Sequence, residues 1–486
     1  MSLTERTTTG VFWNLSEQFA KRGISIAVTL LLAKFLVPED FGLVAMMAVF
    51  LTLGQTLMDS GFREALIRLQ NVTQRDYATA FYANLMLGLV SYGILYFVAP
   101  IIVQFYGEPR LLDLIRVASL TVIITSFQVV QVANLSREMN FKIQLKASFP
   151  AGVVSGTLAV CLAYLDMGAW ALVAQMLLNA TIHTCLLWVL VGWRPGWQFS
   201  WTSVREMYNF GYKLFLSGAL NTIFQNLYVI VIAKIFSAQV AGLYFFAQKI
   251  KELIVQQLVT SIQKVTYPAL ASIQGDEIRL KQGYKKIVVL MSTTLFPGIL
   301  FTAVVADPVF KLLLPEKWWP AVIYFQLLCV ATVMLPLHSI NLNILKVKGR
   351  SDLFLCLEVV KKSVNGLALL VTYRYGVHAI LVGQIVTSVI NYVPNSYFSS
   401  KLLGYGVVEQ LKDFSLVLAI SFVSAGLSFF IVNYIELNPA LTILSAFITM
   451  LASFIGLSIG LNRKSFNVVI GYFITHLLKR PSRTLK

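Results

Sequence analysis

Nine ionisable residues lie in the middle of long apolar segments of this 486-residue sequence. They form three groups with spacings of up to four residues, namely Glu17, Lys21 and Arg22; Lys249, Lys251 and Glu252; and Glu358, Lys361 and Lys362. A charged side chain at the centre of a membrane span costs roughly 2.5–3.5 kcal/mol on insertion scales. Nine such charges facing lipid would cost on the order of 25 kcal/mol. These side chains must therefore face protein or water.

Uncharged polar residues continue these groups along single helix faces, because positions three and four apart share one face of a helix. Thr121, Thr125 and Gln128 form a weaker stripe of the same kind. The stripes predict a central cavity between the two halves of the chain. We expect its substrate-binding side chains to be Lys21, Arg22, Asn221, Gln225, Lys249, Gln256, Lys361, Lys362 and Asn365. Glu17, Glu252 and Glu358 are candidates for coupling transport to H+ or Na+.

The alternative is that opposite charges within each group neutralise each other, because they are three or four residues apart on one helix. Such pairing explains only part of the pattern, since six cations stand against three anions. The remaining positive charge is costly near the membrane centre unless water or an anionic ligand balances it. A cationic cavity therefore favours a substrate that carries phosphate or carboxylate.

The segments that carry these residues indicate a polytopic membrane protein. Apolar residues make up 57% of the chain and charged residues only 13%, against about 25% charged in soluble domains. The all-α fold should contain about fourteen transmembrane helices. Their predicted ranges are 11–36, 41–61, 77–105, 112–133, 147–165, 168–192, 214–236, 241–263, 287–306, 320–345, 352–373, 377–400, 414–434 and 439–461.

The positive charges set the expected orientation of these spans. Loops on the side of the N-terminus hold 26 Lys and Arg residues. The opposite side holds seven, of which Lys34, Arg116 and Lys234 lie at the outer ends of spans, and six more lie deep within spans. Because basic residues stay on the side that is not translocated, both termini should be cytoplasmic. The net charge of +17 is then explained by loops that face anionic membrane lipids, and nucleic acid is not an expected partner.

An internal repeat indicates how the spans are grouped. Residues 31–46 and 231–246 share Ala-Lys and Gly-Leu pairs at an offset of 200 positions. We therefore expect two pseudo-symmetric six-helix lobes, since parallel repeats with a site between them are a transporter arrangement. The lobes should cover 1–205 and 206–405, with two more helices in 406–462 and a basic cytoplasmic tail with an interfacial helix in 463–486.

The sequence carries no clear signature of an enzyme or a metal site. It has no GxxxxGK[ST] motif. Its GLSIG segment (456–460) fits the GxSxG pattern, but it lies within an apolar span and is interpreted as a GxxxG packing motif. Its four histidines and four cysteines are scattered without the spacing of metal ligands. We therefore predict a transporter with no catalytic residue, no bound metal and no cofactor. The GxxxG motif from Gly152 to Gly156 is expected to serve helix packing.

Five segments carry a resemblance to a known family. They are LLLAKFLVPEDFGLVAM (30–46), NLSREMNFK (134–142), AGLYFFAQKI (241–250), YPALASIQGDEIRLKQGYKK (267–286) and LLLPEKWWPAVIYFQLLCV (312–330). In order and in topological position they resemble the polysaccharide-unit flippases of the multidrug/oligosaccharidyl-lipid/polysaccharide (MOP) exporter superfamily. The colanic-acid and teichuronic-acid exporters are the most similar type.

The resemblance implies two lobes that alternate between inward-open and outward-open states in the bacterial inner membrane. The implied cargo is a polyprenyl-diphosphate-linked oligosaccharide for cell-surface or exopolysaccharide synthesis. Its diphosphate would contact cavity cations, here Lys21, Arg22, Lys249, Lys361 and Lys362. A polysaccharide polymerase and other assembly proteins are the implied partners.

Three alternatives remain. A lipid II flippase also has fourteen spans and a cationic cavity, so only the substrate distinguishes it. A multidrug exporter of the same superfamily usually has twelve spans and favours cationic drugs. A membrane-embedded sugar polymerase or ligase usually needs a large outer loop, and every expected outer loop of this chain is short.

Overall fold

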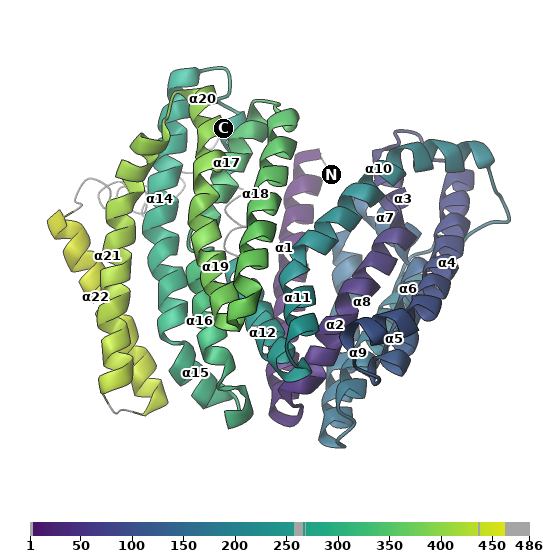
Figure 1. Cartoon of the computed structure of the whole chain (residues 1–486). Coiled ribbons are helices and arrows are strands. Elements are labelled where there is room, and N and C mark those ends of the chain that lie inside the picture. Colours follow the sequence, from purple (N-terminus) through teal and green to yellow (C-terminus); the bar gives the residue numbers. More distant parts are fainter. Residues whose placement is uncertain (1–2, 257–265, 268, 436–437, 462–486) are drawn as a thin grey trace. The chain divides into compact units, whose positions relative to one another are not determined.

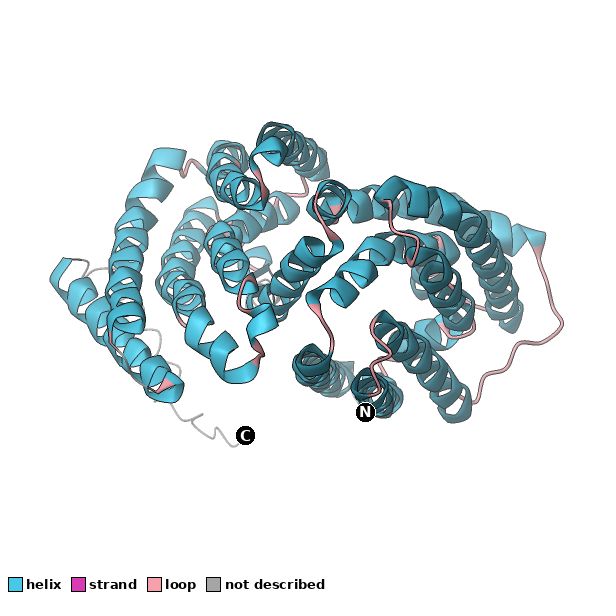
Figure 2. Cartoon of the chain, turned by 60° about the horizontal axis from the view of Figure 1, so that its bottom comes forward, coloured by secondary structure: helices cyan, strands magenta, loops and turns pink. Residues whose placement is uncertain are grey.

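The structure is a computed structural model that describes residues 3–256, 266–267, 269–435 and 438–461. Within these ranges it contains helices, turns and loops and no strand (Figure 1, Figure 2). The all-α class predicted from the sequence is therefore confirmed. The chain divides into two compact units, 1–246 and 247–486. The predicted tail helix in 463–486 lies outside the described residues.

The N-terminal unit contains helices α1 to α11 and the first part of α12. Its long helices are α1 (Leu3–Phe35), α2 (Pro38–Asp59), α4 (Gln74–Tyr106), α8 (Phe141–Tyr164), α9 (Ala169–Leu190) and α10 (Trp201–Gln225). Its shorter helices are α3 (Phe62–Arg68), α5 (Leu111–Ala118), α6 (Leu120–Ser126), α7 (Val129–Arg137), α11 (Leu227–Ile235) and α12 (Ala238–Lys251). This compact unit extends beyond residue 205, where the sequence predicts that the first lobe ends.

The C-terminal unit begins within α12. Its long helices are α14 (Glu277–Val304), α18 (Ser351–Thr372), α21 (Val407–Tyr434) and α22 (Pro439–Leu461). The shorter elements are η1 (Glu252–Gln256), α15 (Ala306–Leu313), η2 (Glu316–Trp318), α16 (Ala321–Thr332), α17 (Leu335–Val347), η3 (Tyr373–Tyr375), α19 (Val377–Ile390) and α20 (Tyr392–Leu403). The two helices predicted after the second lobe are α21 and α22, and α21 packs against both α14 and α22.

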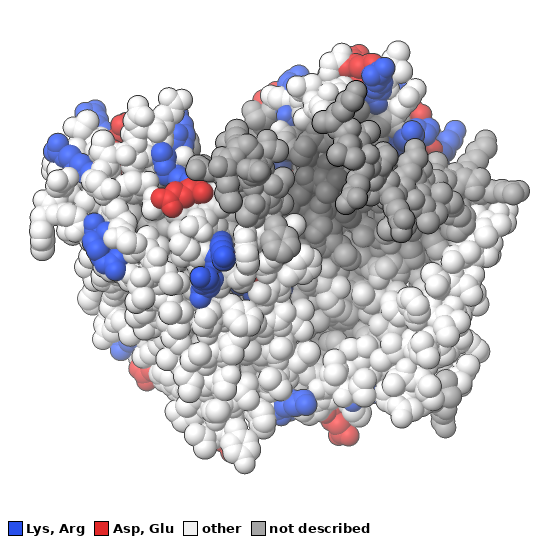
Figure 3. Space-filling model, turned by 180° about the vertical axis from the view of Figure 1, so that it is seen from behind, with Lys and Arg blue, Asp and Glu red and all other residues white. Residues whose placement is uncertain are grey.

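The described helices make this chain a multi-pass membrane protein. Nine helical stretches are long and apolar enough to span a membrane, two of which consist of α16 with α17 and of α19 with α20, and two bent pairs raise the number to eleven. Figure 3 shows a wide stretch of uncharged surface on one face, as lipid contact requires. Three further predicted spans coincide with α1, with α12 and η1, and with α18, which carry the ionisable groups of the sequence. The total of fourteen stays a prediction.

Helix α4 shows how local sequence sets the helix ends. Its N-cap Thr73 accepts a hydrogen bond from the backbone N–H of Asp76, and the Asp76 carboxylate accepts one from the backbone N–H of Thr73 at 2.9 Å. This reciprocal capping satisfies two backbone donors that the helix leaves without partners. The helix ends at Gly107, whose φ of +72° favours glycine.

The turn after α4 is held by an ion-pair cluster. The Arg110 guanidinium donates to both carboxylate oxygens of Glu108, at 2.7 and 3.1 Å, and also to Glu39 of α2. The hydrogen bonds from Arg110 lower the pKa of Glu108 below its usual value. The cluster therefore ties the α4–α5 turn to the start of α2.

An Arg110→Met variant should lose stability in a pH-dependent way. Because the pKa of Glu108 is lowered by folding, its contribution is complete above its unfolded pKa of about 4.3 and is lost as the pH falls through the lowered folded value. Near pH 7 we expect the variant to unfold at a lower temperature, because its free energy of unfolding is lower by at most about 1 kcal/mol. This difference should vanish in acid. Thermal unfolding in detergent between pH 3 and 7 measures this. The control is Arg374→Met at an exposed site, and an equal pH dependence in both variants would contradict the assignment.

The N-terminal ends of α2 and α12 cross with almost no space between their backbones. A Cβ atom on Gly42 would lie 1.9 Å from the carbonyl oxygen of Ala238, and one on Gly242 would lie 1.7 Å from that of Pro38. Real Cβ atoms essentially never approach another atom so closely. Gly42 and Gly242 are the glycines that the two repeat copies share, so these copies contact each other within the N-terminal unit.

In the C-terminal unit, buried polar side chains join α14, α17, α20 and α21. The Asn341 carbonyl accepts from the hydroxyl of Tyr284 and from that of Ser399, the latter at 2.6 Å. Gln410 donates to the Ser399 hydroxyl at 3.3 Å and accepts from the Tyr392 hydroxyl at 2.6 Å. Because buried polar groups are costly without partners, this network fixes how the four helices pack.

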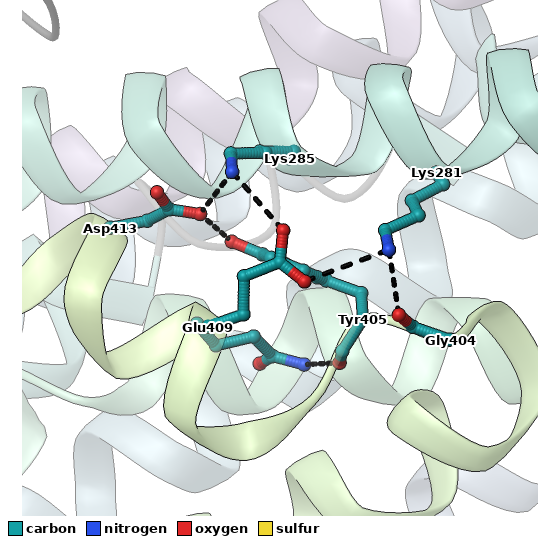
Figure 4. A network of polar contacts seen from close by, with 7 residues as sticks. Lys281, Lys285, Gly404, Tyr405, Glu409 and Asp413 are labelled. Atoms are coloured by element: carbon teal, nitrogen blue, oxygen red, sulfur yellow. Dashed lines mark hydrogen bonds and ion pairs between the residues drawn. The ribbon is translucent and has the colours of Figure 1, made fainter.

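The network continues into charged residues at the start of α21 (Figure 4). The Lys285 ammonium lies 3.3 Å from the Glu409 carboxylate and 3.1 Å from that of Asp413, which also accepts from the Tyr405 hydroxyl. Lys281 donates to the carbonyl oxygen of Gly404 at 2.7 Å. These contacts join the first half of α14 to the α20–α21 turn.

An Asn341→Leu variant should destabilise the C-terminal unit. It leaves the Tyr284 hydroxyl buried without its acceptor, at a cost of roughly 1–3 kcal/mol for an unsatisfied buried donor. Thermal unfolding in detergent measures the loss. The double variant with Tyr284→Phe removes both partners and should recover part of the stability. Equal stability of the single and double variants would contradict the role of this bond.

Candidate functional site

Helices α1, α6, α8 and α9 surround a polar cavity of about 420 Å³ in the N-terminal unit. Helix α1 contributes Lys21 and Ser25, which are four residues apart on one helix face. Helix α9 contributes Gln175, Asn179 and His183, again at intervals of four. The cavity therefore lies between polar faces of helices that are otherwise apolar.

A second cavity of about 570 Å³ adjoins the first. Gln55, Thr125 and Gln128 line both cavities, which are together called the N-terminal cavity below. Volumes of this size lie within the range of about 300–1,000 Å³ typical of small-molecule sites. The N-terminal cavity has the size to hold one or more small chemical groups of a larger substrate.

Helix α10 closes the second cavity with Leu214, Phe215 and Gly218. It is held against the end of α2 by another close approach, because a Cβ atom on Gly211 would lie 2.1 Å from the carbonyl oxygen of Ser60. A glycine at 211 is therefore needed to bring α10 to this wall.

Helix α1 reaches the first cavity because glycines on α8 allow it to pack closely. A Cβ atom on Gly156 would lie 2.4 Å from a methyl carbon of Val28, and one on Gly152 would lie 3.3 Å from a methyl carbon of Ile24. The GxxxG motif thus has the packing role that the sequence predicts. It places the polar face of α1 at the cavity wall.

The charged groups of the N-terminal cavity are paired. Lys21 Nζ lies 2.5 Å from Glu17 Oε1, and the Lys21 side chain is 48% exposed whereas Glu17 is 5% exposed. In the second cavity, Arg63 lies 3.2 Å from Asp59 and 3.0 Å from Glu64. Lys21 is thus an accessible cation that covers a buried carboxylate.

Three other predicted residues of this unit lie outside the lining of the two cavities. Arg22 follows Lys21 on α1 and is half-buried, while Asn221 and Gln225 are exposed near the end of α10. Among the residues that line the N-terminal cavity, only Lys21 belongs to the predicted substrate-binding set. The structure therefore does not bring these predicted residues of α1 and α10 to the same cavity wall.

The remaining predicted residues lie in the C-terminal unit. On α18, Lys361 lies 2.5 Å from Glu358, and Asn365 accepts a hydrogen bond of 2.9 Å from Asn391. Lys362 is half-buried on the same helix.

Around the start of η1, Glu252 accepts from Gln248 at 2.9 Å and Lys249 is half-buried. The side chain of Gln256 lies outside the described part of the chain. The twelve predicted residues are thus divided between two units, and a single shared cavity stays a prediction.

The predicted stripe of Thr121, Thr125 and Gln128 lines the first cavity together with Lys21, but other polar residues of the lining were not predicted. Gln55, Gln175, Asn179, His183 and Ser148 line the cavity and were not among the expected residues. The signal was present on α9, where Gln175, Asn179 and His183 recur every four residues. Uncharged amides at this spacing predict a polar helix face as well as charged residues do.

Two solved structures share this fold. The lipid II flippase MurJ, in an inward closed conformation, superimposes with a TM-score of 0.74 over 93% of this chain and 99% of that one, at 10% identity. An inward-facing multidrug resistance MATE family transporter of the MOP superfamily has a TM-score of 0.58 over 78% of this chain and 95% of that one, at 16% identity. The predicted fold class is confirmed by these similarities.

Curated relatives have names from polysaccharide synthesis. The lipopolysaccharide biosynthesis protein WzxC of Escherichia coli (strain K12) is 27% identical over 365 residues, which cover 74% of each chain. The teichuronic acid biosynthesis protein TuaB of Bacillus subtilis (strain 168) is 24% identical over 438 residues, 88% of this chain and 90% of that protein. The succinoglycan biosynthesis transport protein ExoT of Rhizobium meliloti (strain 1021) is 25% identical over 317 residues, 64% of each chain.

The family can be assigned from a match that covers more than half of the chain. It begins in the last turns of α1 and ends in α16, so it includes the N-terminal cavity except for the wall formed by Lys21, Ile24, Ser25 and Val28. A family model described as polysaccharide biosynthesis protein matches residues 31–323, and the chain therefore belongs to that family.

Proposed function

We propose that this protein is a flippase that moves polyprenyl-diphosphate-linked oligosaccharide units across the bacterial inner membrane by alternating access. The observation that carries the proposal is the polar cavity inside a membrane-spanning unit, with Lys21 accessible at its wall. Polar groups inside a membrane protein are expensive and mark the path of a polar substrate. Membership of a polysaccharide biosynthesis family identifies a sugar-bearing lipid as the fitting cargo.

The proposal makes the protein a transporter that breaks and forms no covalent bond. A relative named as a transport protein supports this class. The fold similarity to a lipid II flippase and to a multidrug transporter, at 10% and 16% identity, concerns architecture alone. Family membership favours polysaccharide units over lipid II and over drugs as the cargo.

The proposed orientation places both termini in the cytoplasm, because the loops on that side carry most of the Lys and Arg residues. The cargo, whose polyprenyl chain lies among the membrane lipids, would then enter from the inner leaflet. It would leave toward a polysaccharide polymerase and other assembly proteins. Coupling to H+ or Na+ through Glu17, Glu252 and Glu358 is part of the proposal. A pH-jump transport assay in which Glu17→Gln and Glu252→Gln behave as wild type would remove proton coupling through those two residues.

Transport in proteoliposomes tests the proposed function directly. The probe is a fluorescent polyprenyl-diphosphate oligosaccharide whose label is quenched by a membrane-impermeant reductant. In vesicles that contain the folded protein, the reductant should quench labelled lipid that starts in the inner leaflet. In protein-free vesicles this lipid should stay protected from the reductant. In cells, deletion of the gene should make the lipid-linked units accumulate on the cytoplasmic leaflet. Unchanged protection in vesicles, together with normal polymer output in the deletion strain, would overturn the proposal.

A further inference from the structure

The uncharged amides of the N-terminal cavity are the feature that the flippase proposal leaves without a role. Gln55, Gln128, Gln175 and Asn179 come from three different parts of the chain and line the same space. An amide side chain offers both donors and acceptors, as sugar hydroxyls require, but no charge. This set of side chains differs from the cationic wall that a diphosphate favours.

Two of these amides have no hydrogen-bond partner among the residues that the structure describes. In the part of the chain that the structure describes, the side chains of Gln55 and Gln175 form no hydrogen bond with a protein group. Buried Ser148, which lines the same cavity, likewise has an Oγ atom that meets no partner among the described residues. Polar groups in this position are available to a ligand or to water.

His183 adds an acceptor to the same wall. Its Nδ1 lies 2.6 Å from Gln128 Oε1, and a carbonyl oxygen can only accept. Nδ1 therefore carries the hydrogen, and in the neutral ring Nε2 has a free lone pair. The lining thus combines amide donors and acceptors with an imidazole acceptor.

The charge of the first cavity argues against a phosphate at this position. Lys21, the one cation among the described residues that line this cavity, is already paired with Glu17 at 2.5 Å. A diphosphate placed among neutral amides would lose hydration without a matching positive charge. An uncharged sugar ring loses only hydrogen bonds with water, which the amides and hydroxyls replace.

We infer that the first cavity is a sugar subsite, in which these neutral amides bind an uncharged pyranose of the cargo while the diphosphate is held elsewhere. The inference rests on the proposed function, because it assigns one part of the same lipid-linked substrate to one set of residues. It makes Gln55 and Gln175 specificity-determining residues. The lipid diphosphate without sugar should be recognised independently of them.

The test compares two probes, polyprenyl diphosphate carrying one glucose and the same lipid without sugar. Binding to purified protein in nanodiscs is measured for wild type, for a Gln55→Met/Gln175→Met variant and for a Gln104→Met control at an exposed site on α4. Because neither cavity glutamine has a partner within the described protein, the replacements should leave the unfolding temperature unchanged. Two lost hydrogen bonds should weaken binding of the glucose lipid by about fivefold to a hundredfold.

Each outcome has a distinct meaning. Weaker binding of the glucose lipid alone, with the control unchanged, supports the sugar subsite. Equal loss for both lipids would mean that the cavity holds the diphosphate, and no loss would mean that it holds neither group; both results overturn the inference. If wild type binds neither lipid, the flippase proposal fails and the inference fails with it. If wild type moves lipid in the proteoliposome assay but the variant binds the glucose lipid normally, only the inference fails.

Discussion

A Gly242→Ala variant is expected to yield almost no correctly folded protein. The added Cβ atom would lie 1.7 Å from the carbonyl oxygen of Pro38 and close to the backbone nitrogen of Gly42, at 2.8 Å. Neither atom belongs to a flexible side chain, so α2 and α12 would have to separate. Overpacking of cores typically costs about 1–3 kcal/mol where side chains can adjust, and a clash between backbones should exceed that range. Size-exclusion profiles and thermal unfolding in detergent measure the result.

The matched control is Gly93→Ala. Gly93 lies inside α4, and an added Cβ would meet no atom within 4 Å. Alanine is the better helix former by about 0.8–1.0 kcal/mol, so this variant should be as stable as wild type or more stable. A stable, monodisperse Gly242→Ala protein that unfolds at the wild-type temperature would show that α2 and α12 do not cross so closely.

The same two glycines show what the sequence could reveal about the fold. The repeat at 31–46 and 231–246 was visible because Gly42 and Gly242 recur at matching positions. Similarity between two segments indicates that they fold alike, but it carries no information on whether they touch. That contact depends on the path of the whole chain between them, including the bend of 47° between α10 and α11.

The candidate site was predictable in the same partial way. Helical periodicity identified the polar face of α1 and placed Lys21 on it correctly, because spacing decides which residues share a face. It could not decide which neighbouring helices that face meets. Gln175 and Asn179 on α9 line the same cavity as Lys21, whereas Asn221 and Gln225 on α10 do not. The hydropathy patterns of these two helix faces are similar and do not distinguish them.

Neutralising Glu17 and Lys21 together is expected to separate binding from folding. Lys21→Gln alone leaves the Glu17 carboxylate, which is 5% exposed, without its partner. An uncompensated buried charge is strongly destabilising, so loss of transport by this variant would be uninformative. The Glu17→Gln/Lys21→Gln variant removes both charges and should keep the wild-type unfolding temperature. Loss of a charged hydrogen bond of about 1.5–3 kcal/mol from Lys21 to a sugar hydroxyl of the cargo should then reduce transport of the fluorescent lipid by roughly tenfold or more.

The control for this pair is Asp307→Asn/Lys311→Gln on α15. It removes another ion pair with four-residue spacing, 2.8 Å between Lys311 Nζ and Asp307 Oδ2, from a helix that the sequence assigns no part in the cavity. This variant should transport as wild type does. The comparison decides between the two explanations of the charges in α1. If the Glu17/Lys21 double variant also transports normally, Lys21 serves only to neutralise Glu17.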